Sequence, residues 1–312
     1  MSNVKTLYLN KCGGLAKEKI EDPLTWQLIN YSSSSDKAWL KQQKHISKQA
    51  RNILLTQDTR PRLILEDGSL IMCLRGINLN KSDDPEDMIS IRLWMDENRI
   101  ITSGNRESMS INNIKKSLEL NTGPSSISGL LLELIVQLAN ITDEFVDKLD
   151  ERLDKEEDSI GESSFETFNP RMSQFRRQIA TIKRFLAPQK EALDKLFRSK
   201  NSYFKESFYD DLYIQIDKLI YILENLDLLR ERALVLQEQF SNRISHQQNS
   251  RLYLLAIISA IFLPLTFFSG LLGMNIGGMP GIESSSAFWL VTGFCIVVAV
   301  GLLILFKKNK WF

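Results

Sequence analysis

The sequence predicts an α+β/α membrane protein: an α/β domain, a charged helical hairpin and a long stalk helix, followed by two C-terminal transmembrane helices. Three observations predict it. Short β-rich runs fill the first third of the chain, no proline interrupts residues 204–263, and two uncharged runs lie near the C-terminus. The expected segments are an α/β domain at 1–126, a helical hairpin at 127–202, a stalk at 203–251, a first span at 252–272, a loop at 273–286, a second span at 287–306 and a basic tail at 307–312.

The α/β domain is predicted from β-branched and aromatic runs separated by turn residues. Asp67-Gly68 is a hairpin signal that joins two of these runs, and "DEN" at 96–98 turns another pair. The expected strands are Thr6–Leu9, Thr25–Ile29, Ile53–Leu55, Arg62–Leu65, Ser69–Arg75, Met88–Met95 and Arg99–Thr102, with helices at Asp36–Gln43 and Ser110–Leu118.

Two long helices of opposite charge are predicted next. The first runs from Ile127 to about Ile160 and holds nine acidic residues from Asp143 to Asp158. The second opens at Pro170 and is rich in arginine and lysine. Matched charge predicts an antiparallel pair. Two alternatives remain open: a solvated charged hairpin, or an acidic helix that attracts cations to the protein.

The two uncharged runs predict a membrane hairpin. Leu252–Leu272 would reach about 32 Å as a helix, enough for a bilayer core, and Ala287–Phe306 is similar in length. Basic residues flank the pair but are absent from the 14-residue loop between the two runs. The positive-inside rule therefore places both ends in the cytoplasm and the loop outside. The flanking basic residues are Arg243, Arg251, Lys307, Lys308 and Lys310.

A stripe of small and weakly polar residues follows heptad spacing along the end of the stalk and the first span, as in helices packed around a common axis. We interpret it as a pore face with apolar constrictions at Leu252 and Leu263, which can gate by dewetting. Packing through small residues is the alternative. Two helices cannot enclose a pore, so transport requires an oligomer. The stripe comprises Asn242, Ser245, Asn249, Leu252, Ala256, Ser259, Leu263, Thr266, Gly270 and Gly273.

Few residues along the predicted pore could contact a metal ion. The stripe holds no carboxylate, so a cation would meet hydroxyls, amides and carbonyls, which suits an ion that keeps its water. His246 lies one residue off the stripe and could form an imidazole ring in an oligomer, able to bind Zn²⁺ or carry protons. A plain surface histidine is the alternative.

Several function classes are disfavoured. The net charge of +1 does not favour nucleic-acid binding. The three cysteines are scattered along the chain and fit no disulfide framework. We find no nucleophile–base pair, no metal-ligand spacing and no phosphate loop, so neither an enzyme nor a bound cofactor is predicted. A membrane-tethered scaffold remains as a third class.

Residues Gly273, Met274 and Asn275 spell "GMN" after "FLPLTFFSG", and the chain ends "FKKNKWF". These features resemble the CorA-type divalent cation transporters. The resemblance implies a homopentameric funnel in a bacterial inner membrane, with the first span lining the pore and the GMN loop at its outer mouth. It assigns pore-lining roles to Asn249, Leu252, Ala256, Ser259, Leu263, Thr266 and Gly270.

The loop departs from the magnesium channels of the family, since "IGGMPGIES" carries glycine at the expected acidic positions and Glu283 is its only acid. This loop is similar to the ZntB branch, the zinc transporters, as are Arg75–Asn80, Pro85–Trp94 and Arg99–Ser103. The branch implies Zn²⁺ transport coupled to a proton gradient, with Glu283 at the outer mouth. A Mg²⁺ or Co²⁺ channel is the alternative, and Ni²⁺ and Cd²⁺ are further candidate substrates.

Overall fold

The computed structural model describes residues 4–16, 23–57, 59–66, 68–80, 84, 87–161, 164–201, 203–274 and 286–308. The chain forms two compact units, Met1–Gln237 and Glu238–Phe312. Each unit is described by itself.

The N-terminal unit is built on a six-stranded mixed sheet with strand order β1-β2-β6-β5-β4-β3. Neighbouring strands are antiparallel except β2 and β6, which run parallel. The strands are β1 (Lys5–Leu9), β2 (Leu24–Asn30), β3 (Arg62–Glu66), β4 (Ser69–Gly76), β5 (Ile89–Met95) and β6 (Arg99–Gly104).

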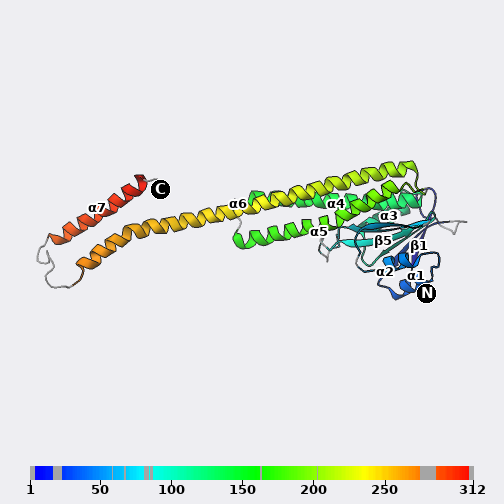
Figure 1. The fold of residues 1–312 in the computed structure, drawn as a ribbon, viewed down its shortest axis with the longest axis horizontal. Coiled ribbons are helices and arrows are strands. Elements are labelled where there is room, and N and C mark those ends of the chain that lie inside the picture. Colours follow the sequence, from blue (N-terminus) through cyan, green and yellow to red (C-terminus); the bar gives the residue numbers. More distant parts are fainter. Residues whose placement is uncertain are drawn as a thin grey trace. The chain divides into compact units, whose positions relative to one another are not determined.

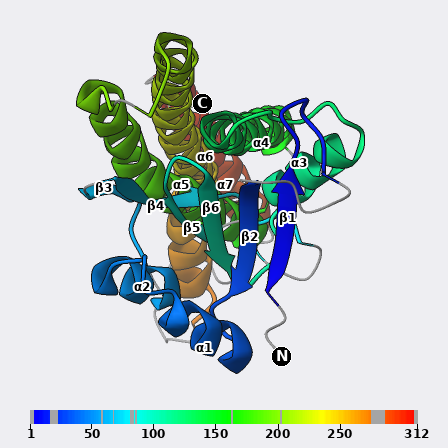
Figure 2. The same cartoon turned by 90° about the vertical axis from the view of Figure 1, so that its right-hand side faces the viewer.

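Helices cover both faces of this sheet (Figure 2). Helices α1 (Ser34–Gln42) and α2 (Lys48–Leu55) lie on one face, and α3 (Met109–Glu119), α4 (Ile127–Asp158) and α5 (Phe165–Ser199) lie on the other. The core beneath α1 and α2 joins helix residues to side chains of the central strands. It includes Leu40, Ala50, Leu54, Ile71, Cys73, Trp94 and Ile101, all almost fully buried.

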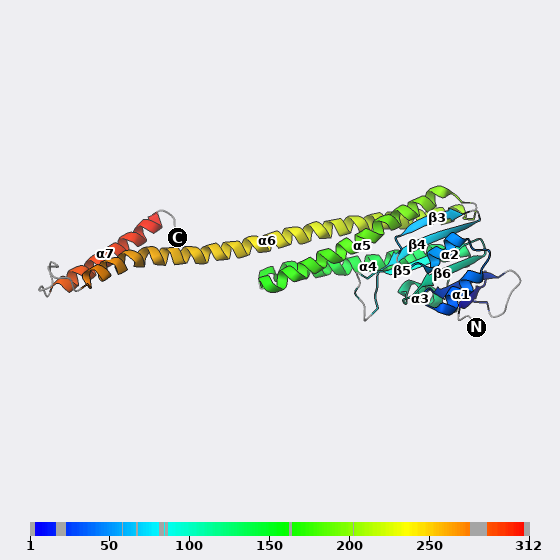
Figure 3. The ribbon, with the colours of Figure 1, turned by 60° about the horizontal axis from the view of Figure 1, so that its bottom comes forward.

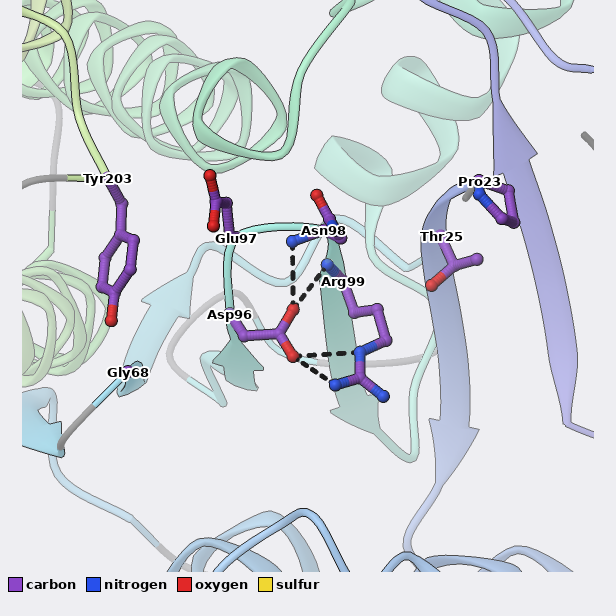
Figure 4. Close-up of a pocket in the computed structure, with 8 residues that line it drawn as sticks. All are labelled: Pro23, Thr25, Gly68, Asp96, Glu97, Asn98, Arg99 and Tyr203. Carbon is purple, nitrogen blue, oxygen red and sulfur yellow. Dashed lines mark hydrogen bonds and ion pairs between the residues drawn. The ribbon is translucent and has the colours of Figure 1, made fainter. Parts of the chain in front are cut away.

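Two predicted hairpins are confirmed. Strands β3 and β4 pair from Glu66 and Ser69 outward, and Gly68 adopts a φ of +78°, which glycine tolerates without steric cost. Asp96 closes the β5–β6 turn, where its carboxylate accepts backbone N–H groups of Asn98 and Arg99 at 3.1 and 2.8 Å and binds the Arg99 guanidinium (Figure 4). This turn chemistry is typical of aspartate before a tight turn.

The predicted strand at Ile53–Leu55 is wrong, because these residues form the last turn of α2. Ser47 caps this helix by accepting the N–H of Ala50 at 3.0 Å. Ala50, Ile53 and Leu54 then fall on one buried face at helical spacing. A run of three apolar residues has no clear period of its own, so the cap and the core decided its structure.

The predicted helix start at Pro170 is also wrong. Helix α5 begins at Phe165 after Ser164, and Pro170 lies inside it. The backbone carbonyl of Ser164 accepts the N–H of Phe168 at 3.0 Å. Pro170 is the sixth residue of this helix, beyond the four N-terminal positions whose N–H groups lack intrahelical partners, so the helix runs through it with one intrahelical hydrogen bond fewer. A short 3₁₀ helix, Ser159–Gly161, follows α4.

Helices α4, α5 and the N-terminal part of α6 (Glu206–Leu272) lie side by side (Figures 1 and 3). Helix α6 contributes a buried apolar line to this bundle: Leu212, Ile216, Leu219, Ile222, Leu226, Leu229, Ala233 and Leu236. The spacing of three and four residues is that of one helix face. The predicted long helix without a break is therefore confirmed.

The ion pairs differ in part from the predicted match between acidic and basic helices. Arg171 of α5 does pair with Glu156 of α4, at 3.2 Å. Other carboxylates of α4 instead pair with α6: Lys218 with Asp143 at 2.8 Å, and Arg232 with a group of three. That group is Asp150 at 2.6 Å, Asp154 at 2.6 Å and Glu157 at 3.1 Å. Arg232 carries one positive charge against three carboxylates, so this group keeps a net negative charge and the cation-attracting alternative stays open.

Candidate functional site

The C-terminal unit consists of the last part of α6, from Glu238 to Leu272, and the whole of α7 (Ala287–Lys308). These two helices form a hairpin. Both helices are long and apolar enough to cross a membrane, as the sequence predicts. Phe268 of α6 and Phe294 of α7 pack edge to face, with ring centroids 5.3 Å apart. This contact identifies the side of α6 that α7 covers.

Five residues on this side of α6 are partly buried, whereas most of their neighbours are exposed. They are Ile257, Ile261, Pro264, Leu265 and Phe268. Their spacing of three and four residues places them on one face of the helix. Partly buried residues of α7 recur with similar spacing, at Val291, Cys295, Val298 and Leu302.

The predicted pore stripe lies on the opposite side of α6. Ser259, Leu263, Thr266 and Gly270 each follow one of the partly buried residues by two positions. Two residues turn an α-helix by about 200°, so these four point away from α7. All four are exposed, and a Cβ atom added to Gly270 would meet nothing within 4 Å. The rest of the predicted stripe in this unit is exposed as well: Asn242, Ser245, Asn249, Leu252, Ala256 and Gly273.

The predicted outer loop is described only at its start. Helix α6 ends at Leu272, and the N–H of Gly273 donates to the carbonyl of Ser269 at 2.9 Å. A Cβ atom at Gly273 would lie 3.0 Å from that same carbonyl oxygen, so the position favours glycine. Met274 follows with 46% of its surface exposed. Asn275 and Glu283 lie outside the described residues.

His246 is exposed on α6. Within the described residues, no group of three or more His, Cys, Asp and Glu side chains is placed to hold a metal ion. Among the described residues, His246 therefore has no such set of companion ligands in its own chain. Its predicted role in a ring of imidazoles from several copies of the chain stays a prediction.

Sequence reasoning missed a line of exposed apolar residues farther up α6. Ile214, Tyr221, Leu228 and Val235 are each more than half exposed and follow one another at intervals of seven. They lie on the N-terminal unit, away from its buried face. The interval of seven was visible in the sequence and continues through Asn242 and Asn249. Exposed apolar residues at heptad spacing are typical of helices that associate with like helices.

The sequence matches a protein family over most of its length. Residues 21–308 match the family model described as a CorA-like Mg²⁺ transporter protein. This chain belongs to the CorA family. The family is one of transporters, so the prediction of a non-enzyme is confirmed.

Individual members of the CorA family are also similar to this chain. The divalent cation transporter CmaX of Pseudomonas aeruginosa is 36% identical over 278 residues, 88% of this chain and 83% of that protein. The zinc transport protein ZntB of Yersinia enterocolitica is 28% identical over 287 residues, 92% of this chain and 87% of that protein. A solved structure of full-length CmaX superposes with a TM-score of 0.86 at 32% identity and covers 100% of this chain and 99% of that chain. The predicted fold class and the CorA resemblance are thereby confirmed.

Proposed function

We propose that this protein transports divalent metal cations, foremost Zn²⁺, across a membrane as a homopentamer whose pore is lined by α6. The observation that carries the proposal is the position of the weakly polar stripe. Ser259, Leu263, Thr266 and Gly270 occupy the face of α6 opposite α7 and remain exposed in the single chain. Five copies arranged about an axis would bring these faces together around an ion path.

A polar stripe is a better pore lining than a lipid-facing surface. The hydroxyl groups of Ser259 and Thr266 are costly to expose to hydrocarbon, where no water can bind them. In a water-filled path they contact a hydrated cation. Leu252 and Leu263 would form apolar rings that close the path by dewetting. The exposed line from Ile214 to Val235 supports self-association of the same helix.

Zn²⁺ is proposed because relatives that match 92% of the chain are named zinc transport proteins. The loop sequence "IGGMPGIES" agrees, since glycine replaces the acids expected of a magnesium channel. The family description itself names Mg²⁺, and a Mg²⁺ or Co²⁺ channel is the second candidate. A membrane-tethered scaffold is a third, and it would have no need of a polar face on the span.

The proposed site has three levels. Gly273, Met274, Asn275 and Glu283 form the outer mouth, and the stripe from Asn249 to Gly270 lines the membrane path. His246 lies just inside, where a ring of imidazoles would bind metal or carry protons coupled to transport. The proposed location is a bacterial inner membrane. Both chain ends lie in the cytoplasm, because basic residues flank the hairpin and avoid its loop.

Metal flux into proteoliposomes tests the function. Purified protein is reconstituted, and uptake of Zn²⁺ and Mg²⁺ is measured with fluorescent indicators, with and without a pH gradient. We expect Zn²⁺ uptake that exceeds Mg²⁺ uptake and responds to the gradient. Faster Mg²⁺ uptake would favour the second candidate. If no divalent cation crosses the membrane, the scaffold is the candidate function that remains.

One matched pair of variants tests the pore face. Ser259→Leu adds an apolar side chain to the stripe, and Ser269→Leu makes the same change about 100° around the helix from Gly270. We expect Ser259→Leu to abolish most of the flux and Ser269→Leu to retain it, with both proteins assembled. Equal flux through the two variants would refute a pore lined by this face.

A further inference from the structure

Two surfaces of opposite charge lie on the N-terminal unit, and the proposed ion path uses neither. Helix α4 carries nine carboxylates and three basic residues between Asp143 and Asp158, whereas α5 carries eight basic and three acidic residues. Arg171 and Glu156 form an ion pair between the two helices, but many of the other charged side chains on both are exposed. The two helices thus present charge of opposite sign to solvent.

The acidic face of α4 consists of Asp147, Asp150, Glu151 and Asp154, which lie within about 100° of the helix circumference. Asp150 and Asp154 bind Arg232, so this face borders α6. Asp147 and Glu151 are exposed and form no ion pair in the part of the chain that the structure describes. One arginine therefore faces several carboxylates, and the acidic face keeps a net negative charge.

A groove of about 670 Å³ lies where α5 borders α6. Lys183 of α5 and Asp227 of α6 form an ion pair across this border. Five of the eight residues that line the groove are basic, and the other three are uncharged. The five residues that define this basic groove are Arg176, Arg177, Lys183, Arg184 and Arg230.

Three arginines of the basic groove have no carboxylate partner among the described residues. Arg176 donates to the neutral side-chain oxygen of Gln237 at 3.0 Å. Arg184 is exposed, and its central carbon lies 5.1 Å from the ring centroid of Phe185. Arg230 is exposed and makes no ion pair within the described part of the chain. The groove therefore keeps a net positive charge.

The acidic face and the basic groove lie on different sides of α6. Arg232 of α6 points to α4, where it binds the acidic face. Arg230 lines the groove and precedes Arg232 by two residues, which turn a helix by about 200°. One copy of the chain therefore cannot place its acidic face in its own groove. Complementary surfaces on different sides of one molecule form head-to-tail contacts, and these close into a ring where the rotation permits.

We propose that the acidic face of α4 docks into the basic groove of the next copy of the chain, so that the same contact repeats around the ring. This contact rests on the self-association in the proposed function and names the surfaces that carry it. A second copy is the partner that fits, because one chain carries both complementary surfaces. Arginine suits the contact, since its N–H groups form strong charge-assisted hydrogen bonds with carboxylates.

Reversal of each surface, and then of both, tests the contact in the full-length detergent-solubilised protein. The groove variant combines Arg176→Glu and Arg184→Glu, and the face variant combines Asp147→Lys and Glu151→Lys. Light scattering over a dilution series gives the concentration at which each assembly dissociates. We expect this concentration to rise about tenfold or more in each variant. The variant with all four changes should regain assembly, because its two surfaces are complementary again.

Lys116→Glu and Glu119→Lys are the matched controls, because both residues are exposed on α3 and belong to neither surface. We expect both controls to assemble as wild type does. If a reversed variant does not fold by circular dichroism, glutamine and asparagine replace the same four residues. A double-mutant cycle between the two neutralised surfaces should then show coupling in the dissociation concentration.

Wild-type assembly of either reversed variant, no recovery in the combined variant, or no coupling in the neutralised set overturns the docking contact. A face variant that assembles normally but binds less Zn²⁺ in equilibrium dialysis also overturns it, and assigns the acidic face to cations. These results leave the proposed homopentamer intact. A wild-type protein that is monomeric at every concentration refutes the homopentamer together with the contact.

Discussion

Phe268 of α6 and Phe294 of α7 pack edge to face, with ring centroids 5.3 Å apart and ring planes at 88°. Their contact determines which side of α6 is covered by its own chain. Gly270, only two residues beyond Phe268, consequently faces away from α7.

The first prediction concerns this aromatic pair. Edge-to-face pairs contribute about 0.5–1.5 kcal/mol beyond the area that they bury. We expect Phe268→Ala and Phe294→Ala each to lower the Tm, and the double variant to lower it by less than the sum. A double-mutant cycle from unfolding in detergent should give a coupling energy of that size. Strictly additive losses would show that the rings do not stabilise the hairpin.

The second prediction concerns Arg232, which binds Asp150, Asp154 and Glu157. Hydrogen bonds to Asp154 and Glu157 raise the pKa of Arg232. Each ion pair is partly exposed and contributes modestly to stability. We therefore expect Arg232→Gln to lower the free energy of unfolding by about 1–2 kcal/mol. Salt screens exposed charges, so the difference from wild type should shrink at high ionic strength.

Arg230→Gln is the matched control for Arg232, because it removes the same charge from the same helix at an exposed position. Chemical unfolding monitored by circular dichroism at low and high salt measures both variants. A loss of stability in Arg232→Gln that does not depend on salt would contradict an electrostatic origin.

The third prediction concerns the exposed heptad line on α6. Leu228 lies on this line and is 57% exposed, whereas Leu234 is 38% exposed and lies off it. An aspartate at either surface position should leave the N-terminal unit folded. We expect Leu228→Asp to reduce assembly, since a charge would be buried between like helices, and Leu234→Asp to assemble normally. Light scattering measures the mass of each solubilised protein. Identical masses for the two variants would show that the exposed heptad line does not form the interface between chains.

The fourth prediction concerns Asn275, the amide proposed for the outer mouth. Asn275→Ala removes the carbonyl and N–H groups that contact an entering hydrated ion. We expect Zn²⁺ flux to fall by most of its value while the oligomer still forms. Flux and particle mass are measured on the same preparation, and unchanged uptake by an assembled variant would refute the role given to this residue.

The fifth prediction concerns pH. Histidine changes charge near neutral pH, and His246 is the histidine near the proposed path. We expect His246→Ala to weaken the pH dependence of Zn²⁺ uptake more than it weakens uptake at the optimal pH. His45→Ala is the control, because His45 lies against Trp94 in the N-terminal unit. Superimposable pH profiles of wild type and His246→Ala would remove His246 from the mechanism.

Sequence alone determined the features that depend on composition and local period. The absence of proline between residues 204 and 263 predicted one long helix, and α6 runs from Glu206 to Leu272. Two uncharged runs predicted two apolar helices, and the glycine of Asp67-Gly68 predicted the β3–β4 hairpin. Each of these signals is contained within neighbouring residues, so no distant contact is needed to read it.

Only the tertiary structure decided which faces and partners those elements use. Ile53–Leu55 became helical because Ser47 caps α2 and the sheet buries its apolar face. Asp150 and Asp154 form ion pairs with Arg232 of α6 rather than with the basic helix α5. Arg92 is buried beside Tyr31. An apolar residue has many acceptable neighbours along the chain, and burial in the core selects among them because it makes one arrangement far more favourable than the rest. The partly exposed carboxylates of α4 then pair with the basic residues of whichever helix this packing brings beside them.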